Sequence, residues 1–262
     1  MSIYLSRLLK RLPDRLYIVA QNARFYREQS NVRYIKYGNL IRVNHEGLNW
    51  VTHRERAHVY RWGLSHRGNA IGHSYLLQNI EFDIGDCIVD CGANMGDLAL
   101  FFYFRKAEIS YIGIEPNPLD FRCLSQNLLS DSKSLNIALW NQNTTIEFFV
   151  DSKGASSSVI EPPRYSEIVN VQATRLDSLK FDKIKLLKVE GEGAEPEILE
   201  GARSILRKIE YISVDWGPER GLLQTSTRDA CLKFLLENSF ALIEENDGGR
   251  KTALFKNNNL KV

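Results

Sequence analysis

The chain has 262 residues, of which 44% are hydrophobic and 25% are charged, as in an ordinary soluble globular protein. Its length allows one large α/β domain with a small extension, and its net charge of +2 argues against binding nucleic acid through overall positive charge. The four cysteines form no C-x-x-C pair and have no zinc-type spacing, which favours a reducing, cytoplasmic compartment and no metal site.

The first residues predict a short amphipathic helix with basic residues between its apolar ones. Apolar residues recur at helical spacing over residues 3–12, and Pro13 is expected to end the helix. Basic residues interrupt the apolar stretch, so a signal peptide is not expected, and no run approaches the roughly 18 apolar residues of a membrane-spanning helix. Two interpretations stay open: the helix packs on the core, or it makes a weak peripheral contact with an anionic membrane or a glycan-assembly partner.

Residues 34–43 alternate apolar and polar side chains around Gly38-Asn39, a pattern that predicts a β-hairpin with a two-residue turn. Residues 45–75 are expected to be irregular; they are aromatic and basic and contain all five histidines. We therefore predict that residues 1–78 form an N-terminal extension and cap, and that residues 79–262 form the main α/β domain.

From residue 86 the pattern changes to strands that alternate with helices, which is typical of a parallel sheet covered on both faces. Strands are predicted at residues 87–90, 111–115, 135–140, 184–189 and 211–215. Helices are predicted at residues 97–104, from Pro118 after the capping residue Asn117, from Pro196, and at 227–238. An insert of extra β structure is expected after the third strand, between residues 144 and 174. A terminal antiparallel hairpin over residues 240–256 is expected to add one reversed strand at the edge of the sheet.

Ligands of such a sheet lie beyond the carboxyl ends of its strands, where the strand order switches. The residues at the predicted strand ends are Asp90, Glu115, Ala138, Glu190 and Asp215. We therefore expect these five residues to lie along one cleft.

The loop within IVDCGANMGD (88–97) predicts a nucleoside-type ligand but not a dinucleotide. A dinucleotide fingerprint would need glycines where this chain has Asn94 and Asp97. The carboxylates of Asp90 and Asp97 would repel a pyrophosphate, whereas they would attract a cationic amino group. S-adenosylmethionine carries such a group, and Glu115 at the next strand tip suits its ribose hydroxyls. The competing interpretation is that the glycines of this loop only allow a tight turn.

Four segments resemble the FkbM-type methyltransferases: VDCGANMGD, IEPNP, LLKVEGEGAEPEILEGA and DWGPERG, within roughly residues 80–256. The resemblance implies a Rossmann-like class I methyltransferase sheet, S-adenosylmethionine as cofactor, and an acceptor hydroxyl on a sugar or a polyketide. It gives the cofactor-loop role to Asp90, Gly92, Asn94 and Gly96, and the ribose role to Glu115 and Asn117. To these we add Ala138, at the third strand tip, as a cofactor-binding candidate. Many members carry K-x-D-x-E-G where this chain has KVEGEG (188–193), so whether Glu190 has the same role as that aspartate stays open.

Methyl transfer to an alcohol requires the acceptor to lose its proton, so we expect a general base near the cofactor. Glu190, Glu192 and Asp215 are the catalytic candidates because they follow the fourth and fifth strands. Clustered carboxylates raise one another's pKa, which brings one of them toward the range of a base at neutral pH. The alternative is that Lys188 neutralises them and leaves them structural.

Candidate acceptor-binding residues are Arg220, just past the fifth strand, and Arg67 and His73 in the segment before the sheet. Arginines interleaved with aromatic residues over residues 50–75 suit stacking on a sugar and pairing with an anionic group, although a merely charged surface has the same composition. We therefore predict an O-methyltransferase of a sugar, glycan or nucleotide-linked sugar, as in polysaccharide biosynthesis. A polyketide or other natural product is the alternative acceptor.

Two further classes of function are less consistent with the sequence. Nucleic-acid enzymes that methylate amino groups often have an N/D-P-P-Y motif after the fourth strand, where this chain has KVEGEG, and its near-neutral charge argues against a phosphate footprint. The other class is a non-catalytic S-adenosylmethionine-binding adaptor whose Rossmann-like core is a relic, and the intact cofactor motifs count against it. We expect a small-molecule or glycan acceptor and no nucleic-acid partner, and the oligomeric state stays open.

Overall fold

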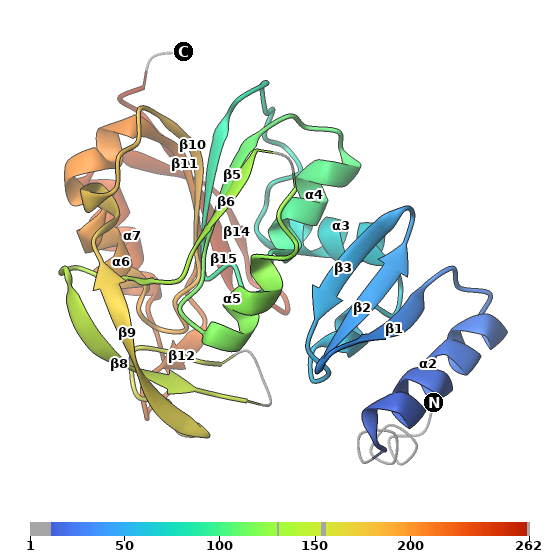
Figure 1. Ribbon diagram of the computed structural model, residues 1–262. Helices are drawn as coiled ribbons and strands as arrows, with labels where there is room; N and C mark the ends of the chain where they lie inside the picture. The colour runs from blue at the N-terminus through green and yellow to red at the C-terminus, as the bar shows by residue number, and fades with distance from the viewer. Residues whose placement is uncertain (1–11, 130, 153–155, 261–262) are drawn as a thin grey trace.

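The computed structural model describes residues 12–129, 131–152 and 156–260, and Figure 1 shows a central β-sheet with helices on both sides of it. The amphipathic helix predicted for residues 3–12 falls outside these ranges except for its last residue. Within them, helix α2 (Asp14–Arg27) begins directly after Pro13. None of the helices that the described ranges contain is long and apolar enough to cross a membrane.

Seven strands form the central sheet in the order β14-β15-β11-β10-β4-β5-β6. Their bounds are β4 Cys87–Cys91, β5 Ser110–Ile114, β6 Ser132–Leu135, β10 Ile184–Val189, β11 Ile209–Asp215, β14 Phe240–Asn246 and β15 Thr252–Asn257. The strands from β11 to β6 pair in parallel, which confirms the predicted mostly parallel sheet. The reversed strand is β15, which pairs antiparallel with β11 and with β14. It is not the edge strand as expected, because the hairpin places β14 outside it.

Helices α3 (Leu64–Ser74), α4 (Asp97–Phe104) and α5 (Pro118–Leu124) lie on one face of the sheet, and α6 (Glu195–Gly201) and α7 (Arg228–Glu237) lie on the other (Figure 1). Each face buries its own apolar cluster. Helix α5 begins as predicted, since Asn117 Oδ1 accepts the backbone N–H groups of Leu119 (2.9 Å) and Asp120 (3.4 Å). Helix α6 is shorter than predicted because the chain continues after Gly201 as a 3-10 turn. The short elements are η2 (Leu176–Ser178), η3 (Arg203–Lys208), β12 (Pro218–Arg220) and β13 (Thr225–Ser226).

The strand predicted at residues 135–140 is divided between two sheets. β6 ends at Leu135, whereas β7 (Ala138–Leu139) pairs with β9 (Glu167–Thr174) of an insert sheet that also contains β8 (Thr144–Val150). Between them, the side-chain amide of Asn136 donates to the backbone oxygens of Glu115 (2.8 Å) and Pro116 (3.1 Å). These bonds take the place of strand pairing, so the chain leaves the central sheet at this point.

The N-terminal part contains more regular structure than predicted. The expected hairpin is β1 (Arg33–Tyr37) and β2 (Leu40–His45), with Gly38 in its turn at a φ of +60°. Residues 45–75, expected to be irregular, add strand β3 (Leu48–Thr52), the 3-10 turn η1 (Ala57–Tyr60) and helix α3. Helix α3 escaped prediction because Gly68 and Gly72 have low helix propensity. A Cβ on Gly72 would overlap the ring of Phe101, so these glycines allow α3 to pack closely on α4.

The N-terminal part and the central sheet share one apolar core, which joins Trp50 and Tyr60 to Phe101 and Leu186. Inside this core a buried asparagine, Asn127, bonds backbone groups of both parts of the chain. Its Oδ1 accepts the N–H of Val51 at 2.6 Å, and its Nδ2 donates to the carbonyl oxygens of Val51 and Met95, each at 2.8 Å. Because Met95 belongs to the loop between β4 and α4, Asn127 ties strand β3 to that loop.

Replacing Asn127 by alanine should lower the free energy of unfolding by about 2–4 kcal/mol, because three buried backbone groups lose their partner. Urea unfolding followed by circular dichroism measures this loss. Asn143→Ala is the matched control: its side chain also bonds a backbone N–H, that of Arg175 at 2.8 Å, but it is exposed, so water replaces the bond and the loss should stay below about 1 kcal/mol. Equal losses in the two variants would show that Asn127 is not a structural connection.

Candidate functional site

The predicted strand-end residues meet at one edge of the sheet. Asp90 lies in β4 and Asp215 ends β11, while Glu115 and Glu190 directly follow β5 and β10. Two hollows open along this edge and share Gly92 and Glu190 in their lining. The first, which we call the apolar hollow, is lined mainly by Ile114, Ile137, Ala138, Leu139, Phe148, Val159 and Ile198. The second, the charged hollow, is lined by Arg56, Arg67, Tyr75, Asp90, Asn94, Asp97, Lys188, Glu190, Glu192, Glu219 and Arg250.

The loop between β4 and α4 turns sharply between the two hollows. Gly92, Asn94 and Gly96 all have positive φ, at 70°, 50° and 88°. A Cβ on Gly92 would overlap the carbonyl oxygen of Glu190, so a glycine is needed for the loop to approach β10. The N–H groups of Gly92 and Ala93 both donate to the carbonyl oxygen of Ile114 at 3.0 Å. The loop is thus fixed to the ends of both neighbouring strands.

Lys188 is a buried ammonium that joins this loop to two carboxylates. Its Nζ lies 2.9 Å from Asp90 Oδ1 and 2.8 Å from Glu190 Oε2, and it donates to the carbonyl oxygens of Cys91 (3.0 Å) and Gly92 (2.7 Å). The side chains of Lys188 and Asp90 are only 3% and 1% exposed. Burial would lower the pKa of Lys188, but the charges of Asp90 and Glu190 outweigh it and raise that pKa, so the ammonium stays protonated.

Glu190 and Asp215, two of the three predicted catalytic carboxylates, hold a second cation. Arg250, from the turn between β14 and β15, donates Nη1 to Glu190, to Asp215 Oδ2 at 2.6 Å and to Tyr75 Oη at 2.6 Å. Burial would raise the pKa of Glu190, but Lys188 and Arg250 together hold it well below its usual value. A carboxylate that releases its proton so readily is a weak base, which argues against the base role expected of Glu190.

The third candidate, Glu192, is in a different environment and has a partner that sequence reasoning missed. Glu192 and Glu219 both line the charged hollow and also an outer hollow with Asp151, Ser156, Pro162, Pro163, Arg164 and Gln224. Within the described residues neither carboxylate forms an ion pair. Burial and the charge of Glu219 raise the pKa of Glu192, while burial and the charge of Asp215 raise the pKa of Glu219 to about 7. The sequence signal for Glu219 is its position in DWGPERG, directly before the candidate Arg220.

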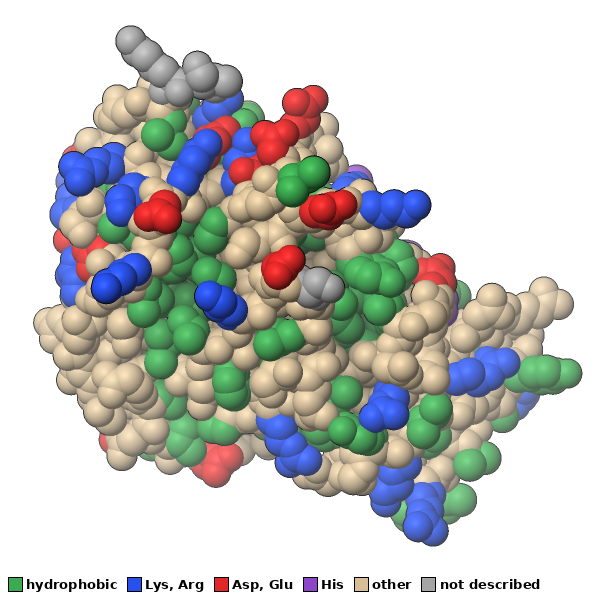
Figure 2. Space-filling view, turned by 45° about the horizontal axis from the view of Figure 1, so that its top comes forward, with side chains coloured by type: hydrophobic (Ala, Val, Ile, Leu, Met, Phe, Trp, Pro, Cys, Tyr) green, Lys and Arg blue, Asp and Glu red, His purple; other side chains and the backbone are tan. Residues whose placement is uncertain are grey.

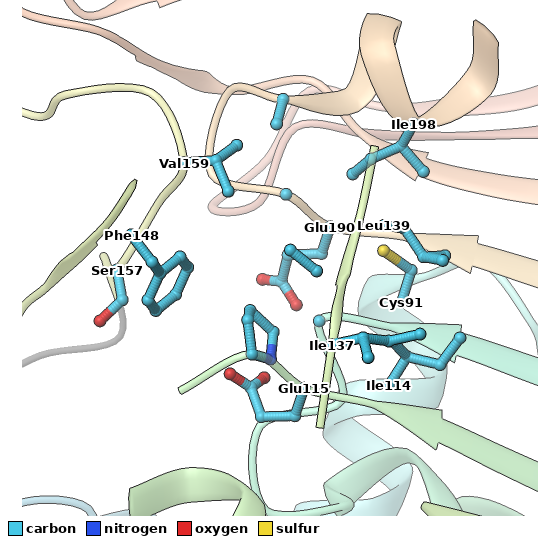
Figure 3. A pocket seen from close by; sticks show the side chains of 15 residues that line it. Cys91, Ile114, Glu115, Ile137, Leu139, Phe148, Ser157, Val159, Glu190 and Ile198 are labelled. Atoms are coloured by element: carbon cyan, nitrogen blue, oxygen red, sulfur yellow. The ribbon is translucent and has the colours of Figure 1, made fainter. Parts of the chain in front are cut away.

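Glu115 lies at the wall between the apolar hollow and the loop. Its Oε2 accepts the N–H of Asn94 and its Oε1 accepts the N–H of Asn117, each at 2.8 Å. Burial and the nearby carboxylate of Asp120 raise its pKa to about 8. Figure 3 shows the carboxylates of Glu115 and Glu190 facing this hollow, with Phe148 and Val159 on the opposite wall. Of the other cofactor candidates, Gly92 and Ala138 line the apolar hollow, whereas Gly96 and Asn117 shape the starts of α4 and α5.

The predicted acceptor-binding residues are not free to bind an anion. Arg220 makes a bidentate pair with Glu197, at 2.7 and 2.8 Å, and donates to the carbonyl oxygen of Gly193. Arg67 lines the charged hollow, but its Nε and Nη2 contact Asp97 Oδ2 at 2.7 and 2.6 Å. His73 is exposed on α3 and does not line the described hollows. These pairings argue against the clamp role expected of Arg220 and Arg67, because their charges are already neutralised.

The two hollows together fit the expected cofactor on chemical grounds. An apolar slot beside a carboxylate suits an adenosine, whose flat base seeks apolar walls and whose ribose hydroxyls seek an acceptor. Three residues that line the charged hollow have a buried side-chain atom without a hydrogen-bond partner within the described residues: Asp90 Oδ1, Asn94 Oδ1 and Arg56 Nε. Asp90 Oδ1 has the ammonium of Lys188 at 2.9 Å, which leaves one acceptor on Asn94 and one donor on Arg56. An acceptor and a donor suit the ammonium and the carboxylate of an amino-acid arm.

Comparisons with known proteins identify the family of this chain. Residues 90–240 match the family described as the methyltransferase FkbM domain. A curated relative, the methyltransferase sdnD of Sordaria araneosa, is 29% identical over 168 residues, which cover 49% of this chain and 64% of the relative. The chain thus spans less than two thirds of that relative's length.

Solved structures with a similar arrangement have low sequence identity. The methyltransferase FkbM of Methylobacillus flagellatus KT is 18% identical, with a TM-score of 0.49, and the match covers 70% of this chain and 46% of that one. TrmK of M. capricolum in complex with S-adenosyl-homocysteine is 13% identical, with a TM-score of 0.40, over 72% of this chain and 68% of that one.

Lys188→Met should lower the free energy of unfolding by about 3–5 kcal/mol at neutral pH, because Asp90 is left as a buried, uncompensated carboxylate. The loss should be smaller at pH 5 than at pH 8. A buried carboxyl with a raised pKa is protonated at low pH, so its unfavourable charge appears only as the pH rises. Urea unfolding across this pH range measures both effects.

The control for this variant is Lys183→Met. The Lys183 side chain is 60% exposed, and its ammonium lies 3.1 Å from Glu210. Its loss should stay below about 1 kcal/mol and vary little with pH. A loss in Lys188→Met as small as the control's would mean that the buried charges do not depend on Lys188.

Proposed function

The chain belongs to the FkbM family of S-adenosylmethionine-dependent methyltransferases, and from this premise we propose that it methylates a hydroxyl of a sugar, in a glycan or linked to a nucleotide. S-adenosylmethionine supplies an electrophilic methyl group on its sulfonium when it is bound. In this proposal the apolar hollow takes the adenine, Glu115 accepts hydrogen bonds from the ribose hydroxyls, and Gly92 lets the loop approach the cofactor. Ala138 lines the apolar hollow, and the N–H of Asn117 holds the Glu115 carboxylate in place at 2.8 Å.

The observation that carries the proposal is the pair of unneutralised carboxylates, Glu192 and Glu219, between the charged hollow and the outer hollow. A hydroxyl is a poor nucleophile until it loses its proton, so its methylation benefits from a base with a raised pKa. Glu192 is the base in this proposal, and Glu219 raises its pKa through repulsion. Glu190 and Asp215 are already occupied by Lys188 and Arg250, which supports a positioning role for both.

The outer hollow supports a sugar as the acceptor. Carboxylate, hydroxyl and amide side chains line it, with Pro162 and Pro163 as its apolar part. Such groups donate to and accept from the hydroxyls of a sugar ring, whereas a flat apolar polyketide would leave them without partners. Arg164 is exposed at the same hollow and replaces Arg220 as the group proposed for the phosphate of a nucleotide-linked sugar.

A nucleic-acid acceptor receives less support. The outer hollow contains three acidic side chains, those of Asp151, Glu192 and Glu219, against one arginine. In Figure 2 the basic side chains of the main body have acidic ones between them, and the basic side chains of the N-terminal part, at lower right, lie among exposed apolar ones. A continuous basic track for a phosphate backbone is therefore not found on this face of the described residues.

Transfer of a labelled methyl group from S-adenosylmethionine should be fastest to a sugar acceptor. The panel contains a neutral oligosaccharide, a nucleotide-linked sugar, a polyketide alcohol and a transfer RNA. Arg164→Ala should slow transfer to the nucleotide-linked sugar alone, by about tenfold, because a charge-assisted contact is lost. Fastest transfer to the polyketide alcohol, unchanged in Arg164→Ala, would contradict the sugar proposal.

Glu192→Gln should lower turnover by about 100-fold or more while it keeps the size of the side chain. In the wild type, turnover should rise with pH through about 7, as the Glu192–Glu219 pair loses its shared proton. Glu219→Gln removes the charge that raises the pKa of Glu192, so the rising limb should move to lower pH. Glu190→Gln removes a smaller contribution to the raised pKa of Glu192, so it should move that limb in the same direction but by less than Glu219→Gln does. A pH profile that is the same in all three variants would exclude the pair as the base.

A further inference from the structure

In the part of the chain that the structure describes, Arg56 is a cation without a carboxylate partner, whereas other arginines of its segment are paired. Arg54 pairs with Asp14 at 2.6 Å, Arg61 lies 4.0 Å from Glu28, and Arg67 pairs with Asp97 at 2.6 Å. Within the described residues Arg56 forms no ion pair, and its buried Nε has no hydrogen-bond partner. Its side chain lines the charged hollow together with the loop residues Gly92, Ala93 and Asn94. A buried donor that stays unpaired is costly. The Nε of Arg61 is unpaired as well, but Arg61 does not line the hollow, so it is the combination found at Arg56 that points to a ligand there.

The charged hollow also contains a buried acceptor without a partner, Asn94 Oδ1. The other end of the same amide is in use, since Asn94 Nδ2 donates to Asp120 Oδ2 at 3.3 Å. An unpaired donor with a positive charge and an unpaired acceptor, both in one hollow, are complementary to the two ends of an α-amino acid zwitterion. The guanidinium matches the carboxylate, whose two oxygens it can bind in parallel, and the amide oxygen matches the ammonium.

We propose that Arg56 binds the α-carboxylate of the cofactor's methionyl arm and that Asn94 accepts a hydrogen bond from its ammonium. The inference rests on the family's cofactor and not on the identity of the acceptor. It makes the N-terminal part of the chain a component of the cofactor site, because Arg56 is contributed by the segment between β3 and η1. No sequence pattern separates Arg56 from the other arginines around it.

The position of Arg56 favours the cofactor, and not an anionic acceptor, as the ligand of its guanidinium. Arg56 lines the charged hollow but not the outer hollow, and the residues shared by these two hollows are Glu192 and Glu219. An anion that entered from the outer hollow would meet these two carboxylates before the guanidinium. An anion attached to a nucleoside in the apolar hollow would instead reach Arg56 along the loop at Gly92, which both inner hollows share.

The backbone around Arg56 is held in place independently of a ligand. The Arg56 N–H donates to the carbonyl oxygen of His53 at 3.1 Å, and His53 Nε2 lies 3.0 Å from Asp120 Oδ1. Since Asp120 also bonds Asn94, one carboxylate positions both residues of the proposed subsite. The subsite is therefore preorganised, which reduces the ordering cost of binding.

The test is calorimetric binding of two ligands to the full chain without any acceptor. One ligand is S-adenosylhomocysteine, and the other is S-adenosyl-3-thiopropylamine, which is the same molecule without the carboxylate. Arg56→Ala should weaken S-adenosylhomocysteine by roughly 10- to 100-fold, as expected for a lost charge-assisted contact, and should change the second ligand by less than about threefold. Arg56→Lys, which keeps the charge but not the planar fork, should show an intermediate loss for S-adenosylhomocysteine alone.

Arg61→Ala is the matched control, because it removes a guanidinium of the same segment that stacks on Trp62 at 4.3 Å and does not line the hollow. Both affinities should stay at wild-type values in this variant, and the melting temperatures of all variants should agree within a few degrees. Equal weakening of both ligands in Arg56→Ala would overturn the proposal, since it would indicate a structural role. Unchanged affinity for S-adenosylhomocysteine in Arg56→Ala would also overturn it, since the guanidinium would then not bind the carboxylate.

Discussion

The buried ammonium of Lys188 is the interaction on which the site depends. It neutralises Asp90 and Glu190 and donates to two carbonyl oxygens of the loop after β4, so one charge connects two strands and that loop. A charged group is stable in such a place only if every partner is present, because the desolvation of an ammonium is not offset by one contact alone. The same arrangement fixes the loop at Gly92, where both inner hollows meet. The shape of the proposed cofactor site therefore follows from the placement of one lysine.

The acidic residues of the cleft are of two kinds: some are paired with a lysine or an arginine, and others are not paired within the described residues. Glu190 and Asp215 are held by Lys188 and Arg250, and they position the strands and the terminal hairpin. Glu192 and Glu219 have no such cation in the described residues, so repulsion and burial raise the pKa of both. The pKa of Glu190 is thus lowered, whereas that of Glu192, two residues away, is raised. The cause is Lys188 together with Arg250, which pair with Glu190 but, within the described residues, not with Glu192.

The N-terminal part is bound to the cofactor loop by polar contacts as well as by the shared core. Asp97, the first residue of α4, accepts from Tyr60 Oη at 2.5 Å and from Arg67 Nε at 2.7 Å, and Asn127 ties β3 to Met95. These contacts explain why the acidic Asp97 does not face the ligand as an unpaired charge. Arg56 and Asn94 line the same charged hollow. In our proposal the residues between β3 and α3 are therefore part of the cofactor site.

Local patterns in the sequence were enough to predict most strands of the central sheet, the loop at Gly92 and the gathering of Asp90, Glu115, Glu190 and Asp215 at one edge. This is so because burial sets the apolar periodicity of each strand, and parallel strands necessarily bring their carboxyl ends together. The same patterns did not reveal helix α3, whose glycines pack on α4, or the division of the third strand, which depends on the contacts of Asn136. They also did not separate Glu192 from Glu190 or Arg56 from Arg67. Arg250 distinguishes Glu190 from Glu192, and Asp97 distinguishes Arg67 from Arg56, because each pairs with only one of the two. These partners come from distant parts of the sequence, so the distances that decide a pKa or leave a guanidinium unpaired exist only after the chain has folded.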